Sequence, residues 1–206
     1  NIMAAVCILD EFEVHKNEKF LKTAERLKPG LHEKLVRPQN LQVLDKKQFK
    51  RNDQVVLDFG DHQVGYVTLG LSSAGSHQDA PAYIYLRFAE RIEELGADPA
   101  EYDGWISKSW IQEEYIHVDV LPAELSLPRR YAFRYLEIKV IDVSMKFSVV
   151  VDDVYVKAVS SVCQDDISPL KMEDPLLRKV DHVAIRTLQN CMQDVFEDGP
   201  KRDRRL

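Results

Sequence analysis

The sequence contains few cysteines and no pattern among them. Cys7, Cys163 and Cys191 are the three cysteines in 206 residues, and no Cys-x-x-Cys pair occurs. The odd number and the wide spacing argue against a disulfide scaffold and against a cysteine zinc module. No Asn-x-Ser/Thr sequon is present, and the start has no basic segment followed by a long apolar stretch. We therefore expect a reducing, cytoplasmic setting.

Long apolar runs and an excess of basic charge are also missing. The longest apolar runs are far shorter than the ~20 residues needed to cross a bilayer, so no membrane span is predicted. The chain has 28 basic and 34 acidic residues, a net charge of −6. That balance argues against a nucleic-acid binder, whose affinity depends on neutralising phosphates. The six histidines show no His-Glu-x-x-His spacing, and we predict no metal and no other cofactor.

What the sequence does contain is alternation of apolar and polar residues from Gln54 to Ser160, which is typical of β-strands. No helical pattern separates these segments, and this favours an antiparallel sheet over a parallel one. The fold class expected is mainly β, an antiparallel β-sandwich of the jelly-roll type. The predicted strands are Gln54–Phe59, Gly65–Ser72, Ala82–Ala89, Tyr115–Val120, Phe133–Val140 and Phe147–Val159.

Helical periodicity appears only towards the two ends of the chain. A short helix is expected over Asn17–Leu27, inside a lead-in segment of residues 1–50. A long helix is expected to begin with Asp174 as N-cap and Pro175 at the first helical position, and to end at Gly199-Pro200. Its apolar residues repeat at helical spacing: Leu177, Val180, Ala184, Leu188, Cys191 and Val195.

A lone amphipathic helix needs a surface on which to pack, and few residues follow this one. The helix packs either on the sandwich or on a domain that this sequence does not include, and we expect the second. The predicted organisation is a lead-in segment at 1–50, a β-sandwich at 51–160, and a linker with the first helix of a truncated helical domain at 161–206.

Two groups of residues are candidates for function. Trp105 and Trp110 sit in or beside the loop Gly96–Ser109, where aromatic faces either stack on sugar rings or pack on a neighbouring domain. The segment from Asp198 to Arg205 is dense in charge, which is typical either of a solvated helix end or of a site.

Several motifs, taken in order, resemble the bacterial α-L-rhamnosidases of glycoside hydrolase family 78. The segment from Asp174 to Arg202 resembles the opening helix of that family's (α/α)₆ catalytic barrel. The order and spacing of the motifs agree over residues 54–206. The motifs similar to the preceding β-sandwich are Asp58-Phe59-Gly60, Val64-Gly65-Tyr66-Val67, Leu86–Glu90 and Phe133–Ile138.

The resemblance implies an inverting hydrolase of terminal α-linked L-rhamnosides and therefore a carbohydrate ligand. Such chemistry uses two carboxyl groups about 6.5–9.5 Å apart, one as acid and one as base. The resemblance implies that Asp198 and Arg202 bind the sugar and that Asp203 takes the place of the general acid, where the family has Glu. An alternative alignment places the family Glu at Arg204. The general base would lie in the missing barrel, so residues 1–206 alone should be inactive.

Two other functions are compatible with the pattern. One is a non-catalytic, carbohydrate-binding β-sandwich in which Trp105 and Trp110 form the surface that stacks on the sugar. The other is an interaction protein in which the helix after Asp174 docks on a partner, and a homo-oligomer would fit this alternative.

Overall fold

The computed structural model describes residues 31–96, 98–101, 103–105, 110–163, 167–168 and 170–201. The helix expected over Asn17–Leu27 lies outside these residues. The chain divides into two compact units. Of the described residues, the sheet unit contains those from Lys34 to Ala158 together with Pro200 and Lys201, and the helix unit contains those from Val159 to Gly199.

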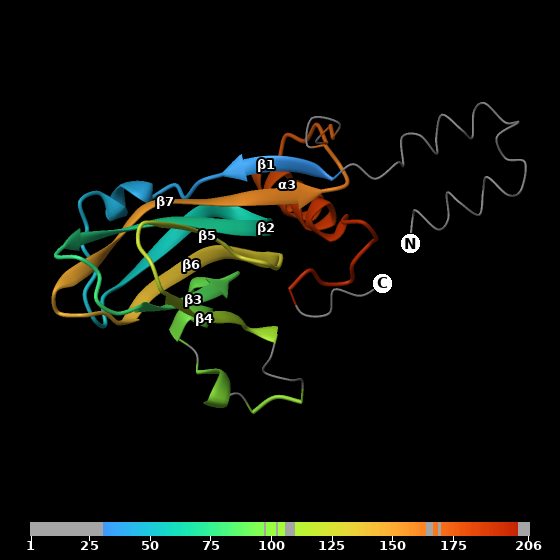
Figure 1. Cartoon of the computed structure of the whole chain (residues 1–206). Coiled ribbons are helices and arrows are strands. Elements are labelled where there is room, and N and C mark those ends of the chain that lie inside the picture. The colour runs from blue at the N-terminus through green and yellow to red at the C-terminus, as the bar shows by residue number, and fades with distance from the viewer. Residues whose placement is uncertain are drawn as a thin grey trace, which may run out of the picture. The chain divides into compact units, whose positions relative to one another are not determined.

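The sheet unit is an antiparallel β-structure (Figure 1). Its strands, in the order β1-β7-β2-β6-β3-β4, form one sheet in which β5 also pairs with β2. The mainly-β fold followed by a helix, expected from the sequence, is confirmed. The strands are β1 (His32–Val36), β2 (Gln54–Gly75), β3 (Ala82–Ala89), β4 (Gln112–Val118), β5 (Ala123–Ser126), β6 (Tyr131–Asp142) and β7 (Phe147–Ser160).

Strand β2 is longer than the sequence predicts, because the two expected strands 54–59 and 65–72 are one continuous strand. Its first half pairs with β6 and its second half with β7 and β5. The pairing register shifts between Asp58 and Gln63, and Gly60 has a φ of 81°. A glycine at positive φ bends the chain without ending the strand. The glycine was thus interpreted wrongly as a strand end.

The core of the sheet unit is built from inward-facing apolar side chains of β2, β3, β6 and β7. Phe88 stacks on Tyr131 with ring centroids 3.9 Å apart and meets Phe133 edge-on at 5.1 Å. Phe49, in the predicted lead-in segment, is fully buried, and its backbone pairs with Val149. Burial of each such aromatic ring contributes roughly 1.5–3 kcal/mol. Among the described residues, short 3-10 helices connect the strands: η2 (Leu41–Leu44), η3 (Ile92–Gly96) and η4 (Pro99–Glu101).

The helix unit contains α3 (Pro175–Cys191), and its predicted start is confirmed. The Asp174 carboxylate accepts hydrogen bonds from the backbone N–H of Leu176 at 2.7 Å and of Leu177 at 3.4 Å. Asp174 therefore satisfies two of the amide groups that every helix leaves open at its first turn. Among the described residues, no helix has the length and apolar character to cross a membrane.

The predicted end of this helix at Gly199-Pro200 is wrong, because α3 stops at Cys191. Its last carbonyl groups find partners outside the helix. Ser160 Oγ donates to the Gln189 carbonyl at 2.8 Å, and the Glu197 N–H donates to the Cys191 carbonyl at 2.9 Å. These bonds replace those that a further helical turn would supply.

Candidate functional site

The charge-dense segment after α3 is described as far as Lys201. Asp198 is exposed, whereas Lys201 is buried, with only 6% of its surface exposed. Arg202, predicted to bind the sugar, and Asp203, predicted to be the catalytic acid, lie outside the described residues. The roles assigned to Asp198, Arg202 and Asp203 therefore stay predictions.

Lys201 is held inside the sheet unit by two contacts. Its ammonium group donates to the carboxylate of Glu94, in η3. It also lies 5.1 Å from the ring centroid of Trp110, which precedes β4. Partial desolvation strengthens both an ion pair and a cation–π contact. The lysine thus attaches the charged segment to the connection between β3 and β4.

A second ion pair lies near Lys201. Glu90, at the end of β3, is 2.9 Å from Nε2 of His62 on β2. Burial would raise the pKa of Glu90, but the hydrogen bond with His62 and the electrostatic influence of His62 and Lys201 lower it below its usual value. An ionised carboxylate is suited to holding a cation rather than to donating a proton. The lowered pKa of Glu90 therefore favours an ion-pairing role over proton donation at this residue.

The structure separates the two predicted stacking residues. Trp105 is 95% exposed, so its ring is accessible to a ligand. Trp110 is partly buried and faces the Lys201 ammonium. Sequence reasoning did not identify Lys201 or Glu94 as partners, because a lysine in a charge-dense tail carries no local signal of burial.

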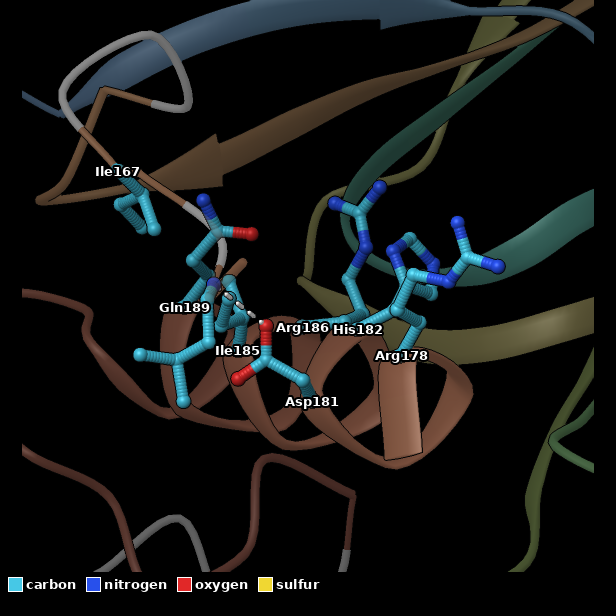
Figure 2. A pocket seen from close by; sticks show the side chains of 8 residues that line it. Ile167, Arg178, Asp181, His182, Ile185, Arg186 and Gln189 are labelled. Atoms are coloured by element: carbon cyan, nitrogen blue, oxygen red, sulfur yellow. Dashed lines mark hydrogen bonds between the residues drawn. The ribbon is translucent and has the colours of Figure 1, made fainter. Parts of the chain in front are cut away.

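A pocket of about 300 Å³ lies within the helix unit, between α3 and the residues Ile167 and Leu170 (Figure 2). The Asp181 carboxylate accepts a hydrogen bond from the Leu170 N–H at 3.1 Å and so joins the two segments. Arg178, His182 and Arg186, spaced four residues apart, give its rim a basic character. No group of three or more His, Cys, Asp or Glu suited to a metal occurs in the part of the chain that the structure describes.

One face of α3 is apolar and open to solvent. Between half and two thirds of the surface is exposed for each of five large apolar side chains of α3. A helix with a stripe of this kind normally buries it against another element. The exposed residues are Leu176, Leu177, Val180, Val183 and Leu188.

Comparison with known proteins places this arrangement in a family. The profile of the glycosyl hydrolase family 78 alpha-rhamnosidase N-terminal domain matches residues 22–158. The chain belongs to glycosyl hydrolase family 78. The family resemblance of the sequence motifs is thereby confirmed. A search of curated proteins gave no match.

Solved structures of this family extend the comparison. A rhamnosidase from Klebsiella oxytoca with rhamnose bound is 42% identical, with a TM-score of 0.80 over 91% of this family 78 chain and 40% of its own. Two others show similarity of fold alone. The GH78 rhamnosidase of Bacillus sp. GL1 is 20% identical, with a TM-score of 0.53 over 72% of this chain and 14% of its own.

The other structure that is similar in fold alone is the alpha-L-rhamnosidase from Dictyoglumus thermophilum. It is 17% identical, with a TM-score of 0.53 over 86% of this chain and 18% of its own. The family 78 chain therefore spans two fifths or less of the length of each of these three relatives.

Proposed function

We propose that this chain is the accessory β-sandwich, together with the first helix of the catalytic domain, of an enzyme that hydrolyses terminal α-L-rhamnosides. The observation that carries the proposal is the 42% identity to the Klebsiella rhamnosidase over 91% of this chain. That relative has rhamnose bound, which supports a carbohydrate ligand here. The proposed organisation is a lead-in segment at 1–50, the sandwich at 51–160 and the start of a helical domain at 161–206.

The exposed apolar face of α3 supports this organisation. A helical barrel packs apolar helix faces against one another, and Leu177, Val180 and Leu188 supply such a face. In this arrangement the sandwich performs no chemistry. Lys201 itself belongs to the sheet unit, where it pairs with Glu94.

The proposed mechanism is inverting and uses two carboxyl groups. Asp198 and Arg202 bind the sugar, Asp203 protonates the leaving oxygen, and a base in the remainder of the longer protein activates water. A general acid needs a raised pKa. Lys201, Arg202 and Arg204 surround Asp203 in the sequence, and positive charge favours the ionised carboxylate. The rest of the catalytic domain must therefore desolvate Asp203.

The test is hydrolysis of aryl glycosides, an α-L-rhamnoside included, by the longer natural protein that contains these residues. Residues 1–206 serve as the control. We expect cleavage of the rhamnoside by the long form alone, with inversion at the anomeric carbon by NMR. Asp203→Asn should reduce kcat at least about 100-fold, while Asp119→Asn, an exposed change in the sheet unit, should leave it unchanged. No cleavage of any aryl glycoside by the long form would refute the proposal.

A further inference from the structure

A polar pocket lies on one face of the sheet, over β3, β4 and β6. Its volume is about 390 Å³, which is within the range of small-molecule sites. It lies entirely within the sheet unit. The side chains that give it its chemical character are Asn52, Tyr85, Arg87, Tyr115, Glu137 and Lys139.

Hydrogen bonds fix the floor of this pocket. Arg87 Nε donates to Glu113 Oε1 at 2.7 Å and to the Tyr85 hydroxyl at 2.6 Å. Arg87 Nη1 donates to the Leu95 carbonyl at 2.8 Å. The Tyr85 hydroxyl in turn donates to Glu113 Oε1 at 2.6 Å. The Arg87 guanidinium is thus neutralised by Glu113 and held by hydrogen bonds to Tyr85 and Leu95. The floor of the pocket is therefore ordered before a ligand binds.

Glu137 is the unexplained group of the pocket. It is 9% exposed and lies opposite Arg87 in the pairing of β3 with β6. None of the described residues donates a hydrogen bond to its carboxylate. Burial raises the pKa of Glu137, although the charges of Arg87 and Lys139 counteract the rise in part. A buried carboxylate without donors is costly, so a ligand that supplies donors would be favoured there.

Tyr115 forms an aromatic wall beside these polar groups. Its side chain is 60% exposed, yet its ring is braced by Tyr85, with centroids 4.9 Å apart, and by Tyr83 at 6.3 Å. A ring that is exposed and held in place can cover the C–H face of a ligand at little entropic cost.

We propose that this pocket binds one neutral saccharide unit at a site separate from catalysis. Sugar hydroxyls donate to Glu137, Lys139 donates to sugar oxygens, and the Tyr115 ring covers a C–H face. Arg87 and Glu113 neutralise each other, so the charges left in the pocket are those of Glu137, which opposes an anion, and Lys139, which opposes a cation. A neutral polyol carries donors and acceptors on one edge and C–H groups on its face, which matches both parts of the pocket. The site goes beyond the proposed rhamnosidase activity and does not depend on it.

The test is a titration of residues 1–206 with L-rhamnose, D-glucose and D-galactose. Binding is measured by ligand-observed NMR and by calorimetry. We expect at least one sugar to saturate with a Kd of about 1 mM. Tyr115→Ala and Glu137→Met should each weaken binding about 10-fold or more, whereas Tyr115→Phe, which keeps the ring, should stay within about 2-fold of the parent. Matched controls are Tyr66→Ala and Glu124→Met, at exposed positions outside the pocket.

Thermal unfolding of each variant shows whether a lost signal reflects lost fold, and Glu137→Met decides the case if Tyr115→Ala does not fold. No saturation up to about 50 mM of any of the three sugars, or equal affinity in Tyr115→Ala and the parent, would overturn the proposal. Binding to residues 1–206 that disappears in the longer protein would overturn it too, because another domain would then cover the pocket. Rhamnoside hydrolysis is measured separately, so failure of either proposal leaves the other standing.

Discussion

The side chains of Lys201 and Glu94, 107 positions apart in the sequence, form an ion pair in which 6% of the lysine side chain is exposed. The pair joins Lys201, the last residue of the described chain, to the 3-10 helix that follows β3. Its importance for function comes from its position, because the predicted sugar-binding and acid residues Arg202 and Asp203 come directly after it.

Replacement of Lys201 by Met should destabilise the sheet unit. The substitution leaves the Glu94 carboxylate largely buried without its cation, which costs about 3 kcal/mol. Lys146→Met is the matched control, because Lys146 pairs with Asp79 at 2.9 Å but is 65% exposed, and its loss should cost less than about 1 kcal/mol. Urea unfolding of both variants measures the difference. Equal losses of unfolding free energy in the two variants would show that the buried pair of Lys201 and Glu94 contributes no more than an exposed ion pair.

Gly65→Ala should be far more harmful than Gly70→Ala, although both glycines lie in β2. A Cβ at Gly65 would come within 2.1 Å of the Lys157 carbonyl oxygen on β7, whereas at Gly70 the nearest atom is 3.5 Å away. The first clash is with backbone and forces the strands apart, so we expect a loss of about 3 kcal/mol or more. Gly70→Ala should remain within about 1 kcal/mol of the parent. Similar melting temperatures of the two variants would contradict the close approach of β2 and β7.

The ion pair between Asp58 and Arg134 should contribute to stability in a pH-dependent way. Arg134 donates to both Asp58 oxygens, at 2.8 and 2.9 Å. Hydrogen bonding to Arg134 lowers the pKa of Asp58 although burial opposes it. The stabilisation is therefore present above the unfolded pKa and is lost as pH falls through the lower folded pKa.

Asp58→Asn should cost about 1 kcal/mol at pH 7, a modest figure because both partners are partly exposed. The difference from the parent should vanish as the pH falls below the folded pKa of Asp58. Urea unfolding measured from pH 2 to pH 7 tests both points, with the exposed change Asp45→Asn as control. A loss independent of pH would show that packing, rather than charge, is responsible.

Glu137→Gln should act in the opposite direction. Burial raises the folded pKa of Glu137 above its unfolded value, so the folded state is penalised as pH rises through the unfolded pKa and fully so above the folded pKa. The variant avoids that penalty and should be more stable than the parent at pH 7. At pH 3 the two should unfold alike. Destabilisation at pH 7 would mean that the carboxylate has a structural partner.

Asp174→Ala should weaken the start of α3. The substitution removes the acceptor for the N–H groups of Leu176 and Leu177, which typically costs about 1 kcal/mol. Circular dichroism during thermal unfolding should show reduced helicity that is lost at a lower temperature. Glu173→Ala, one position earlier, is the control and should change neither. An unchanged variant at Asp174 would show that other contacts fix the helix start.

Local patterns in the sequence predicted those parts of the fold that depend on near neighbours. The strand Ala82–Ala89 was predicted with its observed bounds, because Ile84, Leu86 and Phe88 alternate and all three are fully buried. The N-cap of α3 was predicted from two adjacent residues. The short strands β1 and β5 were not predicted, because their sequences are mostly polar and exposed.

The errors concern partners that lie far away in the sequence. The last turn of α3 bonds to Ser160, about 30 positions earlier, and no pattern within the helix reveals that partner. The same holds for the candidate site. The charge of the segment after α3 was visible in the sequence, but the burial of Lys201 against Glu94 and Trp110 depends on tertiary structure.

Strand β2 has a consequence for how the sandwich folds. Because one continuous backbone bonds to β6 along its first half and to β7 along its second, neither half of the sheet can form or separate without constraining the other. The partners of β2 are also distant, as in the pair Gly65 and Ala158. We therefore expect the sheet unit to unfold in one cooperative step, and to refold within milliseconds to seconds, as sheets with non-local pairing do.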